Sequence, residues 1–135
     1  MKYLIDSSAL TRVLRKQADP SWHEIEARGL LAVCEPILAE SLLIATSKNY
    51  QETEEDIRSR YLPVTIPDRI WDLAAAIRRE LARYSAHRGL SVADLVIAAT
   101  AIRLKLTLLH EDADYETVAR FMPELQQHRL SAGPL

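Results

Sequence analysis

Short apolar segments that favour β-strands alternate with helical segments along this chain, and this alternation constrains the fold more than any other feature. Strands are predicted at residues 2–5, 30–34, 63–66, 107–109 and 127–130. Helices are predicted from a cap at Ser7 or Ser8 to Leu14, and at residues 21–28, 36–47, 49–61, 67–84, 91–104 and 115–121. Because parallel neighbouring strands need crossover connections, the pattern predicts an α/β sandwich around a mostly parallel sheet.

The length and composition are those of one domain, expected to span residues 1–135. A chain of 135 residues with 48% hydrophobic content can bury one core but not two. The lone Cys34 has no partner for a disulfide, which favours a reducing compartment such as the cytoplasm. Asp6 interrupts the first apolar segment early, and charged residues interrupt the later one, so neither a signal peptide nor a membrane span is expected.

The net charge of -2 lacks the basic excess typical of proteins that bind nucleic acid by electrostatics alone. Net charge conceals the distribution of charges, however. A metal-dependent nuclease also commits several carboxylates to its metal site, so the composition does not exclude an RNA substrate.

Four acidic residues stand at positions where ordinary surface charge does not explain them. Asp6 ends the first strand and Asp112 follows the strand at 107–109, so both belong to the carboxyl edge of the sheet, where ligands bind in such folds. Glu40 is the only charge between Pro36 and Ser47, with Ile37, Leu43 and Ile44 as helical neighbours, and Asp94 is the only charge between Ser91 and Ile102. Buried carboxylates need a cation, hydrogen-bond donors or a raised pKa.

The ligand types in this set indicate a hard cation. Carboxylate oxygens without cysteines or paired histidines suit Mg²⁺ or Mn²⁺ rather than zinc. Purely structural roles compete with this interpretation. Ser91 and Asp94 have capping-box spacing, Asp112 and Asp114 can cap the helix at Tyr115, and Asp6 can begin a turn.

Four segments of the chain, taken in order, resemble the VapC toxins, whose nuclease fold is the PIN domain. They are YLIDSSAL, EPILAESLL, GLSVADLVIAATA and LLHEDADYETVA. The resemblance implies a PIN-like three-layer sandwich with five parallel strands and endoribonuclease activity that leaves a 5′-phosphate and a 3′-hydroxyl. It implies that Asp6, Glu40, Asp94 and Asp112 bind Mg²⁺, for which Mn²⁺ can substitute, with Asp114 as a further ligand and Ser8 as a supporting hydroxyl.

The same resemblance implies a VapB-type antitoxin as partner, with a C-terminal segment that covers the active site, and a homodimer. Three positions depart from the family's usual pattern. Glu111 and Ala113 stand where basic residues are common, so Glu111 is expected either to weaken the attraction of phosphate or to alter the choice of substrate. Tyr115 replaces the usual phenylalanine, and this replacement is expected to have no consequence.

Several residues are candidates for contact with RNA. Arg12, Arg15 and Lys16 are spaced to share a helix face just after Asp6, although the solvated side of an amphipathic helix explains them slightly better. Ser8 and His110 are further candidates near the predicted site. Trp22 and Trp71 lie in helical segments and are assigned to packing rather than to base stacking.

Three other functions are compared with that of a nuclease. A receiver-like phosphoacceptor domain needs paired acids after its first strand and a lysine after a late strand, and this chain has neither. A nucleotide-binding module needs a glycine-rich loop, but Gly29, Gly89 and Gly133 are isolated. A catalytically inactive PIN-fold binding module is the strongest alternative, and the retention of all four acids argues against it.

Overall fold

A five-stranded parallel sheet organises the chain and sets the edge at which the predicted acids lie. The computed structural model describes residues 2–135. The strands run in the order β3-β2-β1-β4-β5 and every neighbouring pair is parallel. They are β1 (Tyr3–Ile5), β2 (Leu31–Val33), β3 (Leu62–Pro63), β4 (Thr107–His110) and β5 (Gln127–Arg129). This topology confirms the predicted α/β class and the five-stranded sheet.

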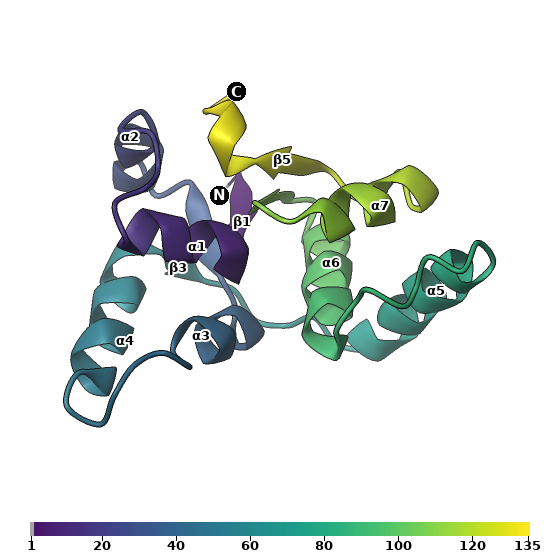
Figure 1. Cartoon of the computed structure of the whole chain (residues 1–135), viewed down its shortest axis with the longest axis horizontal. Coiled ribbons are helices and arrows are strands. Elements are labelled where there is room, and N and C mark those ends of the chain that lie inside the picture. Colours follow the sequence, from purple (N-terminus) through teal and green to yellow (C-terminus); the bar gives the residue numbers. More distant parts are fainter. Residues whose placement is uncertain (1) are drawn as a thin grey trace.

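Helices connect the strands and cover the sheet. They are α1 (Ser7–Leu14), α2 (Trp22–Ala27), α3 (Glu35–Ser41), α4 (Tyr50–Arg60), α5 (Ile70–Ala82), α6 (Val92–Leu104) and α7 (Ala113–Phe121), followed by the short 3₁₀ helix η1 (Leu130–Ala132). Figure 1 shows α1 to α4 on one side of β1, and α5, α6 and α7 on the other. No helix in residues 2–135 combines the length and the apolar character that crossing a membrane requires.

The central strands are buried on both faces, as expected for a parallel sheet covered by helices. Tyr3, Leu4 and Ile5 of β1 are all fully buried, and so are Leu108 and Leu109 of β4. The sheet therefore forms a rigid base from which the chain leaves at the carboxyl ends of β1 and β4.

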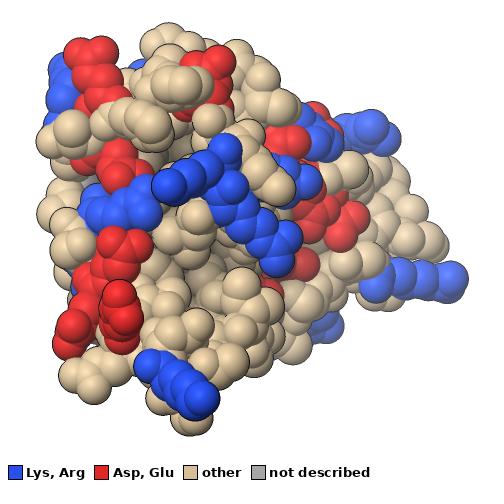
Figure 2. Space-filling view, turned by 60° about the vertical axis from the view of Figure 1, so that its left-hand side comes forward, with Lys and Arg blue, Asp and Glu red and all other residues tan. Residues whose placement is uncertain are grey.

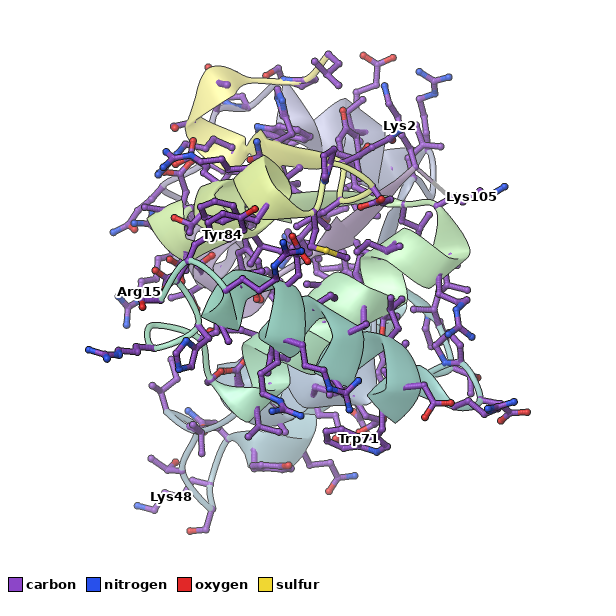
Figure 3. All side chains as sticks on the ribbon, turned by 90° about the vertical axis from the view of Figure 1, so that its right-hand side faces the viewer. Lys2, Arg15, Lys48, Trp71, Tyr84 and Lys105 are labelled. Carbon is purple, nitrogen blue, oxygen red and sulfur yellow. The ribbon has the colours of Figure 1, made fainter. Side chains whose placement is uncertain are left out.

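The two tryptophans have different environments, and only Trp22 packs within this chain. Trp22 is buried against Tyr3, and its indole N–H donates to the carbonyl of Leu130 at 3.0 Å, which confirms its packing role. Trp71 does not belong to the core of this chain, because 63% of this residue is exposed, on the outer side of α5 in Figure 3, so packing at an interface remains a prediction. Its position next to Ile70 at the start of α5 places it one residue off the buried stripe of that helix.

Two predicted helices differ from the structure at their ends. The helix expected at residues 36–47 ends at Ser41, and turn hydrogen bonds follow it, so Leu43 and Ile44 are exposed rather than packed around Glu40. Continuous apolar character cannot distinguish a helix from an apolar turn. The helix expected from Pro67 begins only at Ile70, because Arg69 has a φ of 61° and cannot be part of a right-handed helix.

Candidate functional site

Asp6 is the central acid of the site, and it lies at the junction of β1 and α1. Its backbone N–H donates to the carbonyl of Leu109 at 2.8 Å, which ties the end of β1 to β4. Its carboxylate Oδ2 accepts hydrogen bonds from the backbone N of Ser8 at 3.1 Å and from Ser8 Oγ at 2.8 Å. Asp6 therefore caps α1 itself, whereas Ser7 or Ser8 was predicted to do so.

Tyr115 connects Asp6 to Asp94 through its hydroxyl group. The phenol lies 3.0 Å from Asp6 Oδ1 and 3.0 Å from Asp94 Oδ1, and Tyr115 is fully buried in α7. Burial and the two neighbouring carboxylates raise the pKa of the phenol, so it remains protonated and acts as a donor. Asp6 and Asp94, which are far apart in the sequence, therefore contact the same hydroxyl group.

Asp94 combines a structural role with a place in the site. It forms a capping box with Ser91: Asp94 Oδ2 accepts from the backbone N of Ser91 at 3.1 Å, and Ser91 Oγ accepts from the backbone N of Asp94 at 3.0 Å. The other oxygen, Oδ1, faces the hydroxyl of Tyr115. The capping role predicted as an alternative is real, and it fixes the direction of the carboxylate without occupying Oδ1.

Glu40 reaches this pair from α3. Its Oε1 accepts a hydrogen bond from Ser7 Oγ at 3.2 Å. Burial raises the pKa of Glu40, and the negative charges of Asp6 and Asp94 raise it further. The pKa of Asp6 is raised in the same way by burial and by the charge of Asp94, although hydrogen bonds from Ser8 and Tyr115 offset part of this rise. The three carboxylates therefore lie within one another's electrostatic field.

Asp112 and Asp114 lie beside the pair at the start of α7. Asp112 is the N-cap residue of this helix, and its Oδ1 accepts from the backbone N of Asp114 at 2.8 Å. Burial raises the pKa of Asp114, and the charges of Asp112 and Asp94 raise it further. Gly89, in the loop between α5 and α6, leaves room for Asp114, because a Cβ atom at Gly89 would lie 3.3 Å from Asp114 Oδ1.

The arrangement suits a divalent cation in its chemistry but is not a closed metal cage. All five acids offer oxygen ligands, and within residues 2–135 none of them forms an ion pair with lysine or arginine. In the same part of the chain, no three Asp, Glu, His or Cys side chains converge tightly enough to enclose a metal ion. Hydrogen bonding to Tyr115 brings together Asp6 and Asp94. Glu40 lies within the electrostatic influence of both, whereas Asp114 interacts with Asp94 and with Asp112.

The candidate RNA contacts separate into different parts of the molecule. Arg12, Arg15 and Lys16 do not share a helix face, because α1 ends at Leu14 and Lys16 has a φ of 58°. Arg12 and Lys16 line a groove of about 450 Å³ together with Glu111. Arg15 instead lines a separate hollow of about 760 Å³ beside α4, and Figure 3 shows it extending away from the body of the molecule.

The prediction that His110 contacts RNA is wrong, because this residue is completely buried. Its Nδ1 accepts from the backbone N of Asp112 at 3.0 Å, so in the neutral ring the proton lies on Nε2, 2.6 Å from Gln127 Oε1. His110 therefore positions the backbone at Asp112. Ser8 also acts inside the protein, since its Oγ donates to Asp6 and accepts from the backbone N of Glu111 at 3.0 Å.

The expected effect of Glu111 on phosphate is reduced by its local partners. Its carboxylate accepts from the backbone N of Ser131 at 2.7 Å and from Arg129 at 3.3 Å. Although burial acts to raise the pKa of Glu111, these hydrogen bonds and the charge of Arg129 lower it. The negative charge of Glu111 is thus partly neutralised by the C-terminal segment.

Sequence reasoning missed two contributors to the site. Tyr115 was judged an innocuous replacement for phenylalanine, yet its hydroxyl contacts two acids. Ser7 was treated only as a possible helix cap, but its hydroxyl holds Glu40. The one available signal was the general tendency of a tyrosine hydroxyl to have a hydrogen-bond partner when the residue is buried.

Comparisons with known proteins agree with this geometry. A sequence model of the PIN domain matches residues 3–121. Ribonuclease VapC6 of Mycobacterium tuberculosis is 34% identical over 107 residues, which cover 77% of this chain and 83% of the relative. Ribonuclease VapC11 of the same species is 36% identical over 124 residues, covering 87% and 91%.

Solved structures share the fold at lower sequence identity. VapBC2 from Rickettsia felis, bound to a DNA fragment from its promoter, is similar with a TM-score of 0.73 and 21% identity over 96% of this chain and 98% of the other. VapBC-1 from nontypeable Haemophilus influenzae has a TM-score of 0.75 and 16% identity, with the same coverage.

Proposed function

This chain belongs to the PIN-domain family and, within it, to the VapC ribonucleases, and we propose that it is an endoribonuclease that uses a divalent metal ion. Mg²⁺ is the proposed ion, and Mn²⁺ can replace it. The observation that carries the proposal is the placement of Asp6 and Asp94 on one buried hydroxyl, without a basic partner, at the carboxyl edge of the sheet.

The proposed ligands are Asp6, Glu40, Asp94 and Asp112, with Asp114 as a fifth. A divalent ion bound among them would supply positive charge that favours ionisation of the attacking water and stabilises the leaving oxygen. The chain's own residues orient the acids: Ser8 holds Asp6, Ser7 holds Glu40, and Ser91 holds Asp94. Each of these hydroxyl or backbone donors leaves carboxylate lone pairs free for a cation.

RNA is proposed to approach along the groove lined by Arg12 and Lys16. The groove adjoins the acids through Glu111, whose backbone N donates to Ser8 Oγ, the group that donates to Asp6. In this groove, Arg12 and Lys16 would bind backbone phosphates of the RNA without recognising its base sequence. Neutralisation of Glu111 by Arg129 and Ser131 limits the repulsion of phosphate in this groove.

The proposal extends to partners and compartment. We propose a VapB-type antitoxin as the natural inhibitor, since similar chains occur in structures described as VapBC toxin-antitoxin systems. A homodimer and a cytoplasmic location, where RNA is available, complete the proposal. One folding domain over residues 1–135 is proposed on the basis of one contiguous core, to which β1, β2 and β4 contribute, and of one sheet that contains all five strands.

The direct test uses purified protein freed of any antitoxin and incubated with total small RNA. We expect discrete fragments with Mg²⁺ or Mn²⁺, and intact RNA with chelator or with the Asp94→Asn variant. Mapping of the fragment ends should show 5′-phosphates and 3′-hydroxyls. Intact RNA with every metal, from a protein that unfolds cooperatively and binds Mn²⁺, would instead support the inactive binding module.

A further inference from the structure

We infer that Tyr115 is a positioning residue that holds the carboxylates of Asp6 and Asp94 at the separation a divalent ion requires. This inference rests on the proposed function, because it assigns a role within the same site. It differs from the sequence expectation, in which Tyr115 was interchangeable with phenylalanine. The side chains of tyrosine and phenylalanine differ only in the hydroxyl group.

The surroundings of Tyr115 fix its hydroxyl in place. The ring is fully buried and packs against the ring of His110, with centroids 5.4 Å apart. His110 is itself held by the backbone N of Asp112 and by Gln127. A buried ring held in this way cannot turn its hydroxyl away from the acids without disturbing the start of α7.

The hydroxyl of Tyr115 contacts the carboxylate oxygens to which no other group in residues 2–135 donates. Ser8 occupies Oδ2 of Asp6, and the backbone N of Ser91 occupies Oδ2 of Asp94. Tyr115 lies 3.0 Å from Oδ1 of each. Asp6 Oδ2 therefore has two protein donors, Asp94 Oδ2 has one, and the two Oδ1 atoms share the single hydroxyl of Tyr115, so both carboxylates have fixed orientations.

The single proton of the Tyr115 hydroxyl cannot replace a metal cation between the two carboxylates. A phenol has one proton to donate, but two carboxylate oxygens compete for it. The hydroxyl therefore limits the separation of two negative charges that would otherwise repel each other, and it leaves the charge itself uncompensated. Mutation of a residue that orients a metal ligand by hydrogen bonding typically lowers metal affinity about 10- to 100-fold.

The test compares Tyr115→Phe with Tyr3→Phe as its matched control. Tyr3 is also fully buried, but its hydroxyl has no hydrogen-bond partner within residues 2–135. Titration of each purified protein with Mn²⁺, followed by electron paramagnetic resonance of the free ion, gives the dissociation constant without any RNA. We expect Tyr115→Phe to bind Mn²⁺ about tenfold more weakly than the wild type, and Tyr3→Phe to match the wild type.

Cleavage kinetics separate positioning from general damage. We expect the Mg²⁺ concentration for half-maximal cleavage to rise about tenfold in Tyr115→Phe, with the maximal rate largely recovered at saturating Mg²⁺. A variant that was merely destabilised would lose maximal rate without a change in its Mg²⁺ requirement. That result, or an unchanged Mn²⁺ dissociation constant, would overturn the positioning role while leaving the proposed function intact.

A second measurement does not depend on the folding of the variant. In wild-type protein with ¹³C-labelled tyrosine rings, the Tyr115 Cζ resonance should shift when Mg²⁺ is added, whereas the Tyr3 resonance should not. A Tyr115 resonance that is unaffected by Mg²⁺ at concentrations that support cleavage would contradict the inference. If the wild type neither bound Mn²⁺ nor cleaved RNA, the proposed function and this inference would fail together.

Discussion

Two groups of acids in this molecule each contain a tyrosine hydroxyl, but only one of them contains a basic residue. In the paired cluster, Glu26 of α2 accepts two hydrogen bonds from Arg60, at 2.8 and 3.2 Å, and one from the hydroxyl of Tyr61 at 2.9 Å. In the unpaired cluster, Asp6 and Asp94 share the hydroxyl of Tyr115. Figure 2 shows acidic and basic side chains interleaved on the face that carries α2 and α4.

The difference between the clusters shows which acids are structural and which are available to a ligand. In the paired cluster the protein supplies its own cation, and the hydrogen bonds to Glu26 raise the pKa of Arg60. In the unpaired cluster, burial and mutual repulsion raise the pKa values of Asp6 and Glu40. A buried charge without a partner is costly, so its retention indicates a function outside folding.

The largest expected effect is the loss of cleavage when the unpaired cluster loses an acid. Asp94→Asn keeps the size of the side chain but removes a charge needed to bind the cation, so RNA cleavage should fall more than about a hundredfold, beyond the usual effect of residues that only orient ligands. This loss of activity is measured by comparing the rates of RNA cleavage by the variant and the wild type at a fixed Mg²⁺ concentration. The matched control is Asp56→Asn, since Asp56 Oδ2 accepts a hydrogen bond at 3.3 Å from Arg60 of the paired cluster, and a comparable loss there would remove the distinction between the clusters.

The paired cluster should respond in stability instead of activity. Arg60→Met leaves Glu26 without its cation and should lower the free energy of unfolding by about 1–2 kcal/mol, between the effects of exposed and fully buried pairs. Urea denaturation measures this change, and adding Glu26→Gln to the variant should restore part of it. Loss of cleavage per folded molecule would show that this cluster also serves the active site.

A smaller effect of opposite sign is expected from Asp6→Asn. Without metal at neutral pH, this change should raise the free energy of unfolding by about 1 kcal/mol, because it removes a buried charge that Asp94 and Glu40 repel, while asparagine still caps α1. Urea denaturation in chelator gives the value, and Mg²⁺ should stabilise the wild type but not the variant. A less stable Asp6→Asn protein would mean that the charge itself contributes to folding.

The smallest expected effect is a pH dependence of stability in chelator. Raised carboxyl pKa values mean that the folded protein binds protons more tightly than the unfolded chain, so stability falls as pH rises from about 4 through the raised values. Glu111 and Glu116 have lowered pKa values, and their contribution is lost only as the pH falls below the ordinary carboxyl range. Urea denaturation from pH 4 upwards should show this decline, less steeply in Asp6→Asn; a flat profile would contradict it.

The strands and the acids were predictable from sequence, because single charges inside apolar segments need no tertiary information to be recognised. Glu40 and Asp94 stand out on that ground, whereas Asp6 and Asp112 stand out because they follow strands; in the structure Asp6 follows β1 directly and Asp112 lies two residues after β4. The ends of elements were less predictable. The end of α3 at Ser41 and the left-handed Lys16 depend on how the chain turns after the helix, which residue spacing does not encode.

The errors at His110 and Tyr115 have a common cause. His110 is the last residue of β4 and Tyr115 follows this strand closely, so sequence position placed them near the acids but could not give the direction of their side chains. His110 points into the protein and holds the backbone of Asp112, whereas Tyr115 reaches two acids from elements far apart in the sequence. Contacts of this kind require three segments to meet, and no single segment contains the signal.

The most direct test of the unpaired cluster is a crystal grown with Mn²⁺ and measured for anomalous scattering. We expect an anomalous peak within about 2 to 2.5 Å of carboxylate oxygens of both Asp6 and Asp94. The peak should disappear in Asp94→Asn crystals grown under the same conditions. A peak elsewhere, or none at Mn²⁺ concentrations that support RNA cleavage, would contradict the claim that these acids were left unpaired to hold a metal ion.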